Sequence, residues 1–180
     1  QGRYRDISYS PSIDESLILV GDTIGKADAL QTKLEDQFAK LTELVGEKFA
    51  GRESVIGPLK KALPIDPVIS LLLGPISKRS FSQNERSLFG FLASNEKLSF
   101  NQFIQGAYSN ESNQQEMSLY NADLFWDYLT LNLDHIISSS RDSQVWLEAK
   151  DAVYRSTLKG NELHESMTKL IALVTLFGYQ

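Results

Sequence analysis

Two arginines, Arg79 and Arg86, are the residues of this 180-residue chain best suited to chemistry. Both lie in the stretch 64–94, where apolar residues are densest. A guanidinium is permanently charged, and its planar fork of N–H donors matches phosphate and carboxylate groups. Arg79 and Arg86 are therefore candidate sensor or finger residues that would reach a nucleotide phosphate held on another domain or subunit. The alternative is a salt bridge or carbonyl bond that holds two buried helices together.

No other motif supplies a catalytic group. Residues 21–27, GDTIGKA, are similar to a phosphate-binding loop, but the spacing is one residue short and Ala27 replaces the hydroxyl that binds magnesium. His164 lacks the second histidine that a zinc-binding helix requires four positions later, because that position is Thr168. The absence of cysteine excludes disulfides and thiolate metal sites. We therefore expect neither a catalytic residue nor a metal site, and we expect that these 180 residues are not an enzyme.

Charge and composition limit the classes of partner. The formal net charge of −5 argues against a non-specific grip on nucleic acid, so we expect no direct nucleic-acid contact. No apolar run reaches the roughly 18–20 residues that span a bilayer. With 42% hydrophobic residues the chain can form one domain with an adequate core. Because the chain has no cysteine, an intracellular, cytoplasmic location is the simpler interpretation.

Helix-start signals flank the two arginines and define the elements that would position them. Asp66-Pro67 predicts a helix that begins at the proline, since an aspartate cap and proline at the first helical position both suit a helix N-terminus. This helix is apolar nearly all round, and Gly74-Pro75 is expected to end or kink it. A capping box at 82–85 then predicts a second apolar helix after the basic connection 78–81.

Apolar periodicity predicts helices along most of the remaining chain. They are expected from Asp14-Glu15 to Ile24, over 30–49 and 53–63, from a capping box at 99–102, and over 121–138, 142–158 and 161–177. The polar stretch 108–118 is expected to be an exposed loop. The pattern predicts an all-α fold, an irregular multi-helix bundle of about eight or nine helices in a single domain covering residues 1–180.

Three stretches of the chain together resemble one known family. They are QGRYRDI at 1–7, the stretch 64–94, and SSSRDSQVWLEAKDAVYR at 138–155 together with LIALVTLFG at 170–178. They are similar to the region downstream of the nucleotide-binding core in large bacterial P-loop ATPases of the AAA-like or STAND-like kind, multidomain proteins associated with defence against phage. The resemblance covers nearly the whole chain, with the stretches in the same order.

This resemblance implies a helical lid or linker domain of a longer multidomain protein, which couples nucleotide state to neighbouring domains and has no catalysis of its own. The phosphate-binding loop and the magnesium-binding acid would precede Gln1, so ATP and Mg²⁺ would be cofactors of the parent protein and not of this segment. Its partners would be the ATPase domain and a winged-helix-like domain of the same chain. Arg79 or Arg86 would then present its charge to nucleotide held elsewhere.

A second hypothesis belongs to a different class of protein. The chain would be an independent helical module that binds a partner protein through an apolar groove. The loop 108–118, or the aromatic residues Tyr4, Tyr9 and Tyr179, would then lie at the rim of that groove.

Overall fold

The described part of the chain in this computed structural model is all-α, as the periodicity predicts. It comprises residues 13–26, 28–50, 53–77, 79, 86–108 and 117–178. The α-helices are α1 (Ile13–Ile24), α2 (Asp28–Val45), α3 (Ile56–Ala62), α4 (Pro67–Ser77), α5 (Arg86–Ala93), α6 (Phe100–Tyr108), α7 (Ala122–Tyr128), α8 (Asp134–Ser138), α9 (Ser143–Lys159) and α10 (Glu162–Phe177).

Short non-α segments extend or join some of these helices. A π-helical turn, Gly46–Ala50, continues α2, and a 3₁₀ turn, Glu53–Val55, leads directly into α3. A second π segment, Leu129–Leu133, joins α7 to α8. Nine continuous helices and no strand are therefore present in the residues that the structure describes, which confirms the predicted fold class.

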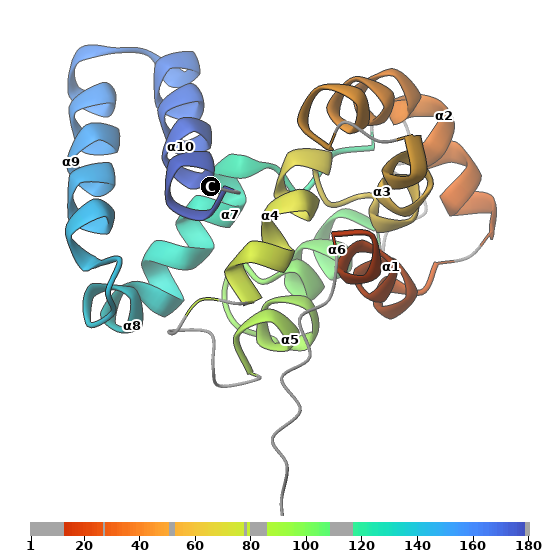
Figure 1. Cartoon of the computed structure of the whole chain (residues 1–180), viewed down its shortest axis with the longest axis horizontal. Coiled ribbons are helices and arrows are strands. Elements are labelled where there is room, and N and C mark those ends of the chain that lie inside the picture. Colours follow the sequence, from red (N-terminus) through yellow and green to blue (C-terminus); the bar gives the residue numbers. More distant parts are fainter. Residues whose placement is uncertain are drawn as a thin grey trace, which may run out of the picture.

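Helix α4 lies at the centre of the molecule (Figure 1). It packs on α1, α2, α3 and α5 on one side and on α10 on the other. All of its residues except Val68 and Ser77 are buried. This agrees with a sequence that is apolar nearly all round, because only a helix enclosed by others can bury every face.

The two ends of α4 differ in how well the sequence predicts them. At its start, Oδ1 of Asp66 accepts a hydrogen bond of 2.8 Å from the backbone N–H of Val68, as expected of a cap. At the other end, Gly74-Pro75 is expected to end or kink the helix, and it does not end it, since α4 continues to Ser77. Proline removes one backbone donor in the last turn, and there the Ser77 hydroxyl donates to the Gly74 carbonyl at 2.7 Å.

An extended segment around Tyr120 connects α4 to the aromatic core. The backbone N–H of Tyr120 donates to the Pro64 carbonyl at 2.8 Å, and the N–H of Asp66 donates to the Tyr120 carbonyl at 3.0 Å. The Tyr120 hydroxyl donates to the carbonyls of Leu98 at 2.6 Å and Leu124 at 3.2 Å. Its ring is fully buried and packs edge-on against rings from α5 and α6, and burial raises the pKa of its hydroxyl.

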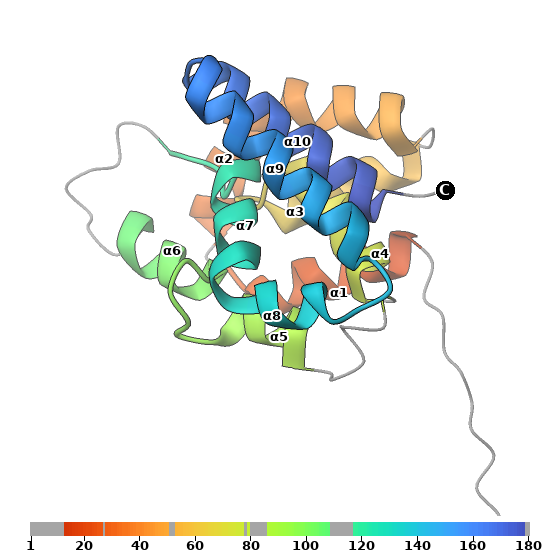
Figure 2. The same ribbon diagram turned by 90° about the vertical axis from the view of Figure 1, so that its left-hand side faces the viewer.

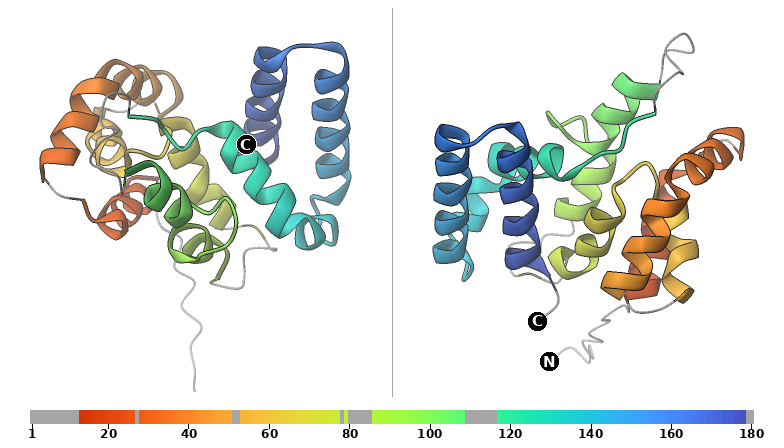
Figure 3. Two further views of the ribbon diagram at one scale, coloured as in Figure 1. Left: turned by 180° about the vertical axis from the view of Figure 1, so that it is seen from behind. Right: turned by 90° about the horizontal axis from the view of Figure 1, so that it is seen from above.

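Helices α9 and α10 form an antiparallel hairpin at one edge of the molecule (Figure 1), and this hairpin faces the viewer in Figure 2. The hairpin begins after Asp142 and turns at Gly160, where the sequence predicts that α9 ends. Asn161 then caps α10 in a reciprocal capping box with His164. Seen from behind and from above, the hairpin packs on the rest of the molecule through α10, with α9 outermost (Figure 3).

Replacing Tyr120 tests whether its hydroxyl bonds stabilise the fold. Tyr120→Phe removes the buried hydroxyl that donates to the carbonyls of Leu98 and Leu124, so we expect the free energy of unfolding to fall by about 1–3 kcal/mol. The matched control is Tyr154→Phe on α9, where the side chain is 63% exposed and the change is expected to stay within about 0.5 kcal/mol. Urea denaturation of the two variants measures the difference, and equal losses would contradict a bonding role for Tyr120.

Candidate functional site

Arg79 lies just beyond the end of α4, and its guanidinium has two partners on the α9–α10 side. Its Nη1 lies 3.3 Å from Oδ1 of Asp142, and its Nη2 donates to the Leu176 carbonyl at 2.7 Å. Asp142 immediately precedes α9, and Leu176 lies in the last turn of α10, where a cation is favoured by the helix dipole. The guanidinium therefore connects the end of α4 to both helices of the hairpin.

Arg86 is the first residue of α5, but its side chain lies outside the described residues. The capping-box residues 82–85 and the aromatic residues Tyr4, Tyr9 and Tyr179 also lie outside them, as does most of the expected loop 108–118. The nucleotide role of Arg79 and Arg86 and the proposed aromatic rim stay predictions.

The segment that is similar in sequence to a phosphate-binding loop, 21–27, contributes residues that pack α1 against α3. A Cβ on Gly21 would lie 2.9 Å from Cβ of Lys61, so glycine allows α1 to approach α3 closely. Gly25 follows the end of α1 with a φ of 43°, a conformation that favours glycine. The Lys26 ammonium donates to the carbonyls of Lys61 and Leu63. Burial lowers the pKa of Lys26 to about 8, although the negative charge of Glu35 acts in the opposite direction and raises it. These contacts fasten the end of α3 to α1.

A charge cluster centred on the buried Lys169 joins α10 to α7. Lys169 is only 7% exposed, and its Nζ lies 2.9 Å from Oε1 of Glu165, 3.1 Å from Oδ1 of Asp127 and 3.9 Å from Oδ1 of Asp123. The second Asp123 oxygen accepts a 2.7 Å hydrogen bond from the Ser166 hydroxyl. One ammonium thus bridges carboxylates of two helices.

The pKa values of this cluster favour its charged form. Burial alone would lower the pKa of Lys169, but hydrogen bonds and charge from Glu165 and Asp127 outweigh burial and raise that pKa above 10.5. The hydrogen bond and charge of Lys169 in turn lower the pKa of Glu165. Sequence reasoning missed this site, although Glu165 and Lys169 have the four-residue spacing of a helical ion pair. No group of three or more His, Cys, Asp or Glu side chains that could hold a metal occurs among the described residues.

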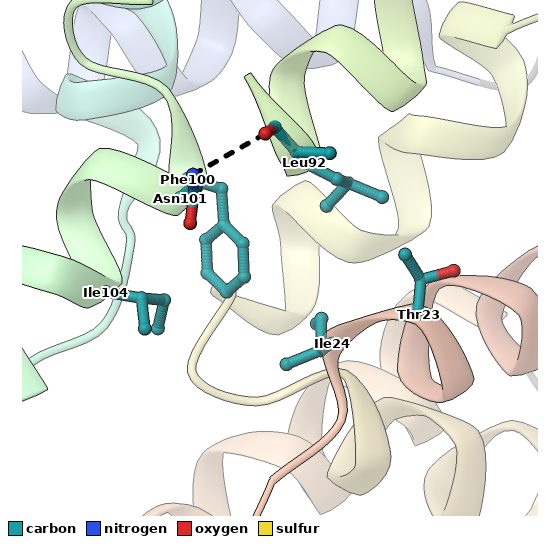
Figure 4. Close-up of a pocket in the computed structure, with 7 residues that line it drawn as sticks. Thr23, Ile24, Leu92, Phe100, Asn101 and Ile104 are labelled. Carbon is teal, nitrogen blue, oxygen red and sulfur yellow. Dashed lines mark hydrogen bonds between the residues drawn. The ribbon is translucent and has the colours of Figure 1, made fainter. Parts of the chain in front are cut away.

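A cavity of about 270 Å³ opens between the ends of α1 and α5 and the start of α6 (Figure 4). Apolar and polar groups together line it, from Thr23, Ile24, Leu92, Ala93, Phe100, Asn101 and Ile104. The Thr23 hydroxyl is bonded to the Leu19 carbonyl, and the Asn101 amide is bonded to the Ala93 carbonyl and to Asn95. No ionisable side chain lines the cavity, so it offers space for an apolar group but no acid, base or activated nucleophile.

Large apolar side chains are exposed mainly along the α9–α10 hairpin. Of the twelve that the described residues expose, eight lie on these two helices: Val145, Leu147, Tyr154, Leu158, Leu163, Met167, Ile171 and Val174. Exposed apolar residues gathered on one element are typical of a surface that contacts another protein. The sequence shows these positions as apolar, but periodicity alone does not tell which side of α10 faces the core.

Four of these side chains form a continuous row, which we call the α10 stripe: Leu163, Met167, Ile171 and Val174. Their spacing of four, four and three residues places them on one side of the helix. Between Met167 and Phe177 the only charged residue is Lys169, which is buried among its carboxylates. From Met167 to its end, the α10 stripe is therefore both apolar and free of exposed charge on its own helix.

The function of Arg79 in the fold can be measured directly. Arg79→Ala leaves Asp142 and the Leu176 carbonyl without their donor, so we expect the free energy of unfolding to fall by about 1.5–3 kcal/mol. Amide hydrogen exchange should also accelerate in the last turn of α10. Arg141→Ala, at an exposed arginine next to Asp142, is the control and should change neither quantity. Normal stability and exchange in Arg79→Ala would show that these bonds do not hold the hairpin.

The Lys169 cluster predicts an unusual dependence on pH. Lys169→Met leaves three carboxylates facing one another, and we expect a loss of about 3 kcal/mol at pH 7, the lower end for a broken buried ion pair because the carboxylates are partly exposed. In the wild type, the lowered pKa of Glu165 contributes stability above pH 4.5 that disappears as the pH falls through its folded value. In the variant, mutual repulsion raises the carboxylate pKa values, so acid relieves the loss.

Urea denaturation at pH 7 and near pH 4 measures this difference. The destabilisation caused by Lys169→Met should shrink markedly at the lower pH. Lys97→Met, at an exposed lysine, should cause little change at either pH. A loss of the same size at both pH values would indicate lost packing and contradict the charge argument.

Comparison with known proteins identifies no relative: no family model matches the chain, and no curated protein or solved structure is significantly similar to it. No helix in the described ranges is long and apolar enough to cross a membrane.

Proposed function

We propose that this chain is a non-catalytic helical domain that binds another protein surface, with the α10 stripe as its contact. The observation that carries the proposal is the exposure of Leu163, Met167, Ile171 and Val174, which range from 38% to 68% exposed along one side of a single helix. An apolar row at helical spacing fits the groove or helix face of a partner. From Met167 onward, no ionisable side chain other than the buried Lys169 lies on this helix to penalise burial of the row.

Contacts with the rest of the fold hold α10 in place, so the α10 stripe is presented to a partner as a rigid surface. Asn161 caps its first turn, Lys169 joins its middle to α7, and Arg79 binds the Leu176 carbonyl in its last turn. A helix held at three points loses little further conformational freedom when it binds, and this reduces the cost of association.

The size of the stripe limits the affinity that it provides. Full burial of a large aliphatic side chain contributes about 1.5–3 kcal/mol, and these four are already partly buried. Free association costs about 4–15 kcal/mol in lost translation and rotation. The stripe alone therefore suits a weak partner or a neighbouring domain of the same polypeptide, for which the linker supplies a high effective concentration.

The narrower form of the proposal is the lid or linker domain of a P-loop ATPase. In that case the partners are the neighbouring ATPase and winged-helix-like domains, and ATP and Mg²⁺ belong to the parent protein. A Gly-x-x-x-x-Gly-Lys-Ser/Thr motif encoded upstream of Gln1 would favour this form. Without such a motif, an independent interaction module remains the better description.

The α10 stripe can be tested by photo-crosslinking in the full-length protein in cells. A benzoylphenylalanine placed at Met167 should crosslink to one defined protein surface, which mass spectrometry identifies. The same group at Lys40, on the exposed polar side of α2, is the control and should crosslink little. Adding Ile171→Lys should abolish the Met167 crosslink while the free energy of unfolding stays within about 0.5 kcal/mol of the parent value. Equal crosslinking at Met167 and Lys40 would refute the proposal.

A further inference from the structure

Helix α9 is the outermost element of the hairpin, and no described residue of another element packs against one of its sides. It packs mainly on α10 and α8, and only Trp146 and Val153 along its length are buried. Trp146 donates from Nε1 to Oδ1 of Asp134 at 2.7 Å, so the inner side is fixed. The opposite side is open to solvent at the edge of the molecule (Figures 1 and 2).

Three apolar side chains stand on that open side. Leu147 is 51%, Tyr154 63% and Leu158 65% exposed. Their spacing of seven and four residues places them in one row along α9. This row is distinct from the α10 stripe, because it lies on the other helix of the hairpin.

Charged residues flank this row in a definite order. Glu148 and Asp151 lie in the first part of α9, whereas Arg155 and Lys159 lie in the second, and all four are exposed. Spacings of three and four residues place them along one flank of the helix. The flank is therefore acidic toward the start of α9 and basic toward its end. We call these four residues together with Leu147, Tyr154 and Leu158 the α9 face.

We infer that the α9 face binds a second copy of this chain, with the two α9 helices antiparallel. A two-fold axis through the middle of α9, near Val153, brings the same flank of both helices together. Asp151 and Arg155 form an ion pair within α9. In the antiparallel pair Asp151 also faces Arg155 of the partner subunit, and Glu148 faces Lys159 of the partner subunit. The apolar row matches as well, since Leu147 faces Leu158 of the partner subunit. The charge pattern is complementary to itself in this orientation.

The charge order favours this orientation over the parallel one. In a parallel pair related by a two-fold axis along the helices, the charged flanks lie on opposite edges of the contact, so their complementary order would contribute nothing to association. A second copy, turned to run antiparallel, presents basic residues opposite the acidic ones and acidic residues opposite the basic ones. A different protein would need to carry this matching order of charges on its own surface. The α10 stripe has no such pattern, so the self-association is assigned to α9 alone and goes beyond the proposed function.

The contact between the two α9 helices is small, so we expect a weak dimer that has to be measured at high protein concentration. Seventeen residues of α-helix span about 25 Å, so a single pair of helices buries less than the roughly 800 Å² per partner of a standard interface. We therefore expect a dissociation constant above about 1 µM. Exposed ion pairs orient the helices, so the affinity should fall as salt is added.

Analytical ultracentrifugation of the 180-residue chain tests the inference. The wild type should form dimers at concentrations of some hundreds of micromolar and should dissociate on dilution or in molar salt. Asp151→Arg places arginines opposite one another and should weaken the dimer at least tenfold. The double variant Asp151→Arg, Arg155→Asp exchanges the charges and should restore it. Ile171→Lys, on the α10 stripe, should leave the dimer intact, and circular dichroism confirms that each variant is folded.

Mixing experiments decide the orientation. The single variants Asp151→Arg and Arg155→Asp should each be monomeric but should form a heterodimer when mixed, because their flanks are then opposite in charge. The chain has no cysteine, so Leu147→Cys and Leu158→Cys introduce unique thiols. An antiparallel pair predicts that the mixed disulfide dominates over either symmetric one. A monomer at the highest concentration, failed restoration by the double variant, or dominant symmetric disulfides would overturn the inference.

Discussion

The burial of α4 on nearly every side is the constraint on which the rest of the structure depends. A helix with apolar residues all round is stable in water only when other helices enclose it, so α1, α2, α3 and α5 cover one side and α10 covers the other. The Asp66 carboxylate and the Ser77 hydroxyl bond to backbone groups at its two ends. Residues beside these ends connect α4 to distant parts of the chain: the Tyr120 carbonyl accepts the Asp66 N–H, and Arg79 bonds to the hairpin. One buried helix thus connects both halves of the molecule.

Charged side chains connect the α9–α10 hairpin to the rest of the fold at several points. Arg79 bonds to the start of α9 and to the end of α10, and Lys169 bridges α10 to α7. Asp134 accepts hydrogen bonds from Trp146 and Lys150 of α9. Helix α10 buries Lys169 together with Ala172, Leu173, Leu176 and Phe177, while several of its other aliphatic residues face solvent. This departs from the usual amphipathic arrangement, in which the charged residues of a helix face water. Such an arrangement suits a surface that is completed by another protein.

The helices and the buried position of α4 could be predicted from the sequence because the signals are local. Asp66-Pro67 marks the start of α4, and Gly160 separates the two helices of the hairpin. The extension of α4 through Pro75 was missed, since burial of the whole helix outweighs one lost hydrogen bond. The partners of Arg79 lie 63 and 97 residues away, and no periodicity predicts such pairs. The inward direction of Lys169 could not be predicted for another reason. Helix α10 is apolar on most sides, so its sequence pattern does not specify which side packs on the core.

The two exposed faces of the hairpin differ in the information that they carry. The α9 face has charges in a fixed order, which select one orientation but contribute little affinity in water. The α10 stripe has no charge order, so it provides apolar contact area and leaves the orientation to its partner. A two-fold axis through α9 would repeat the α10 stripe once in each copy of the chain. A protein that presents two matching surfaces would then bind both stripes together, and avidity would compensate for the small area of each. Two weak faces on one hairpin can in this way support a specific assembly that neither face would support alone.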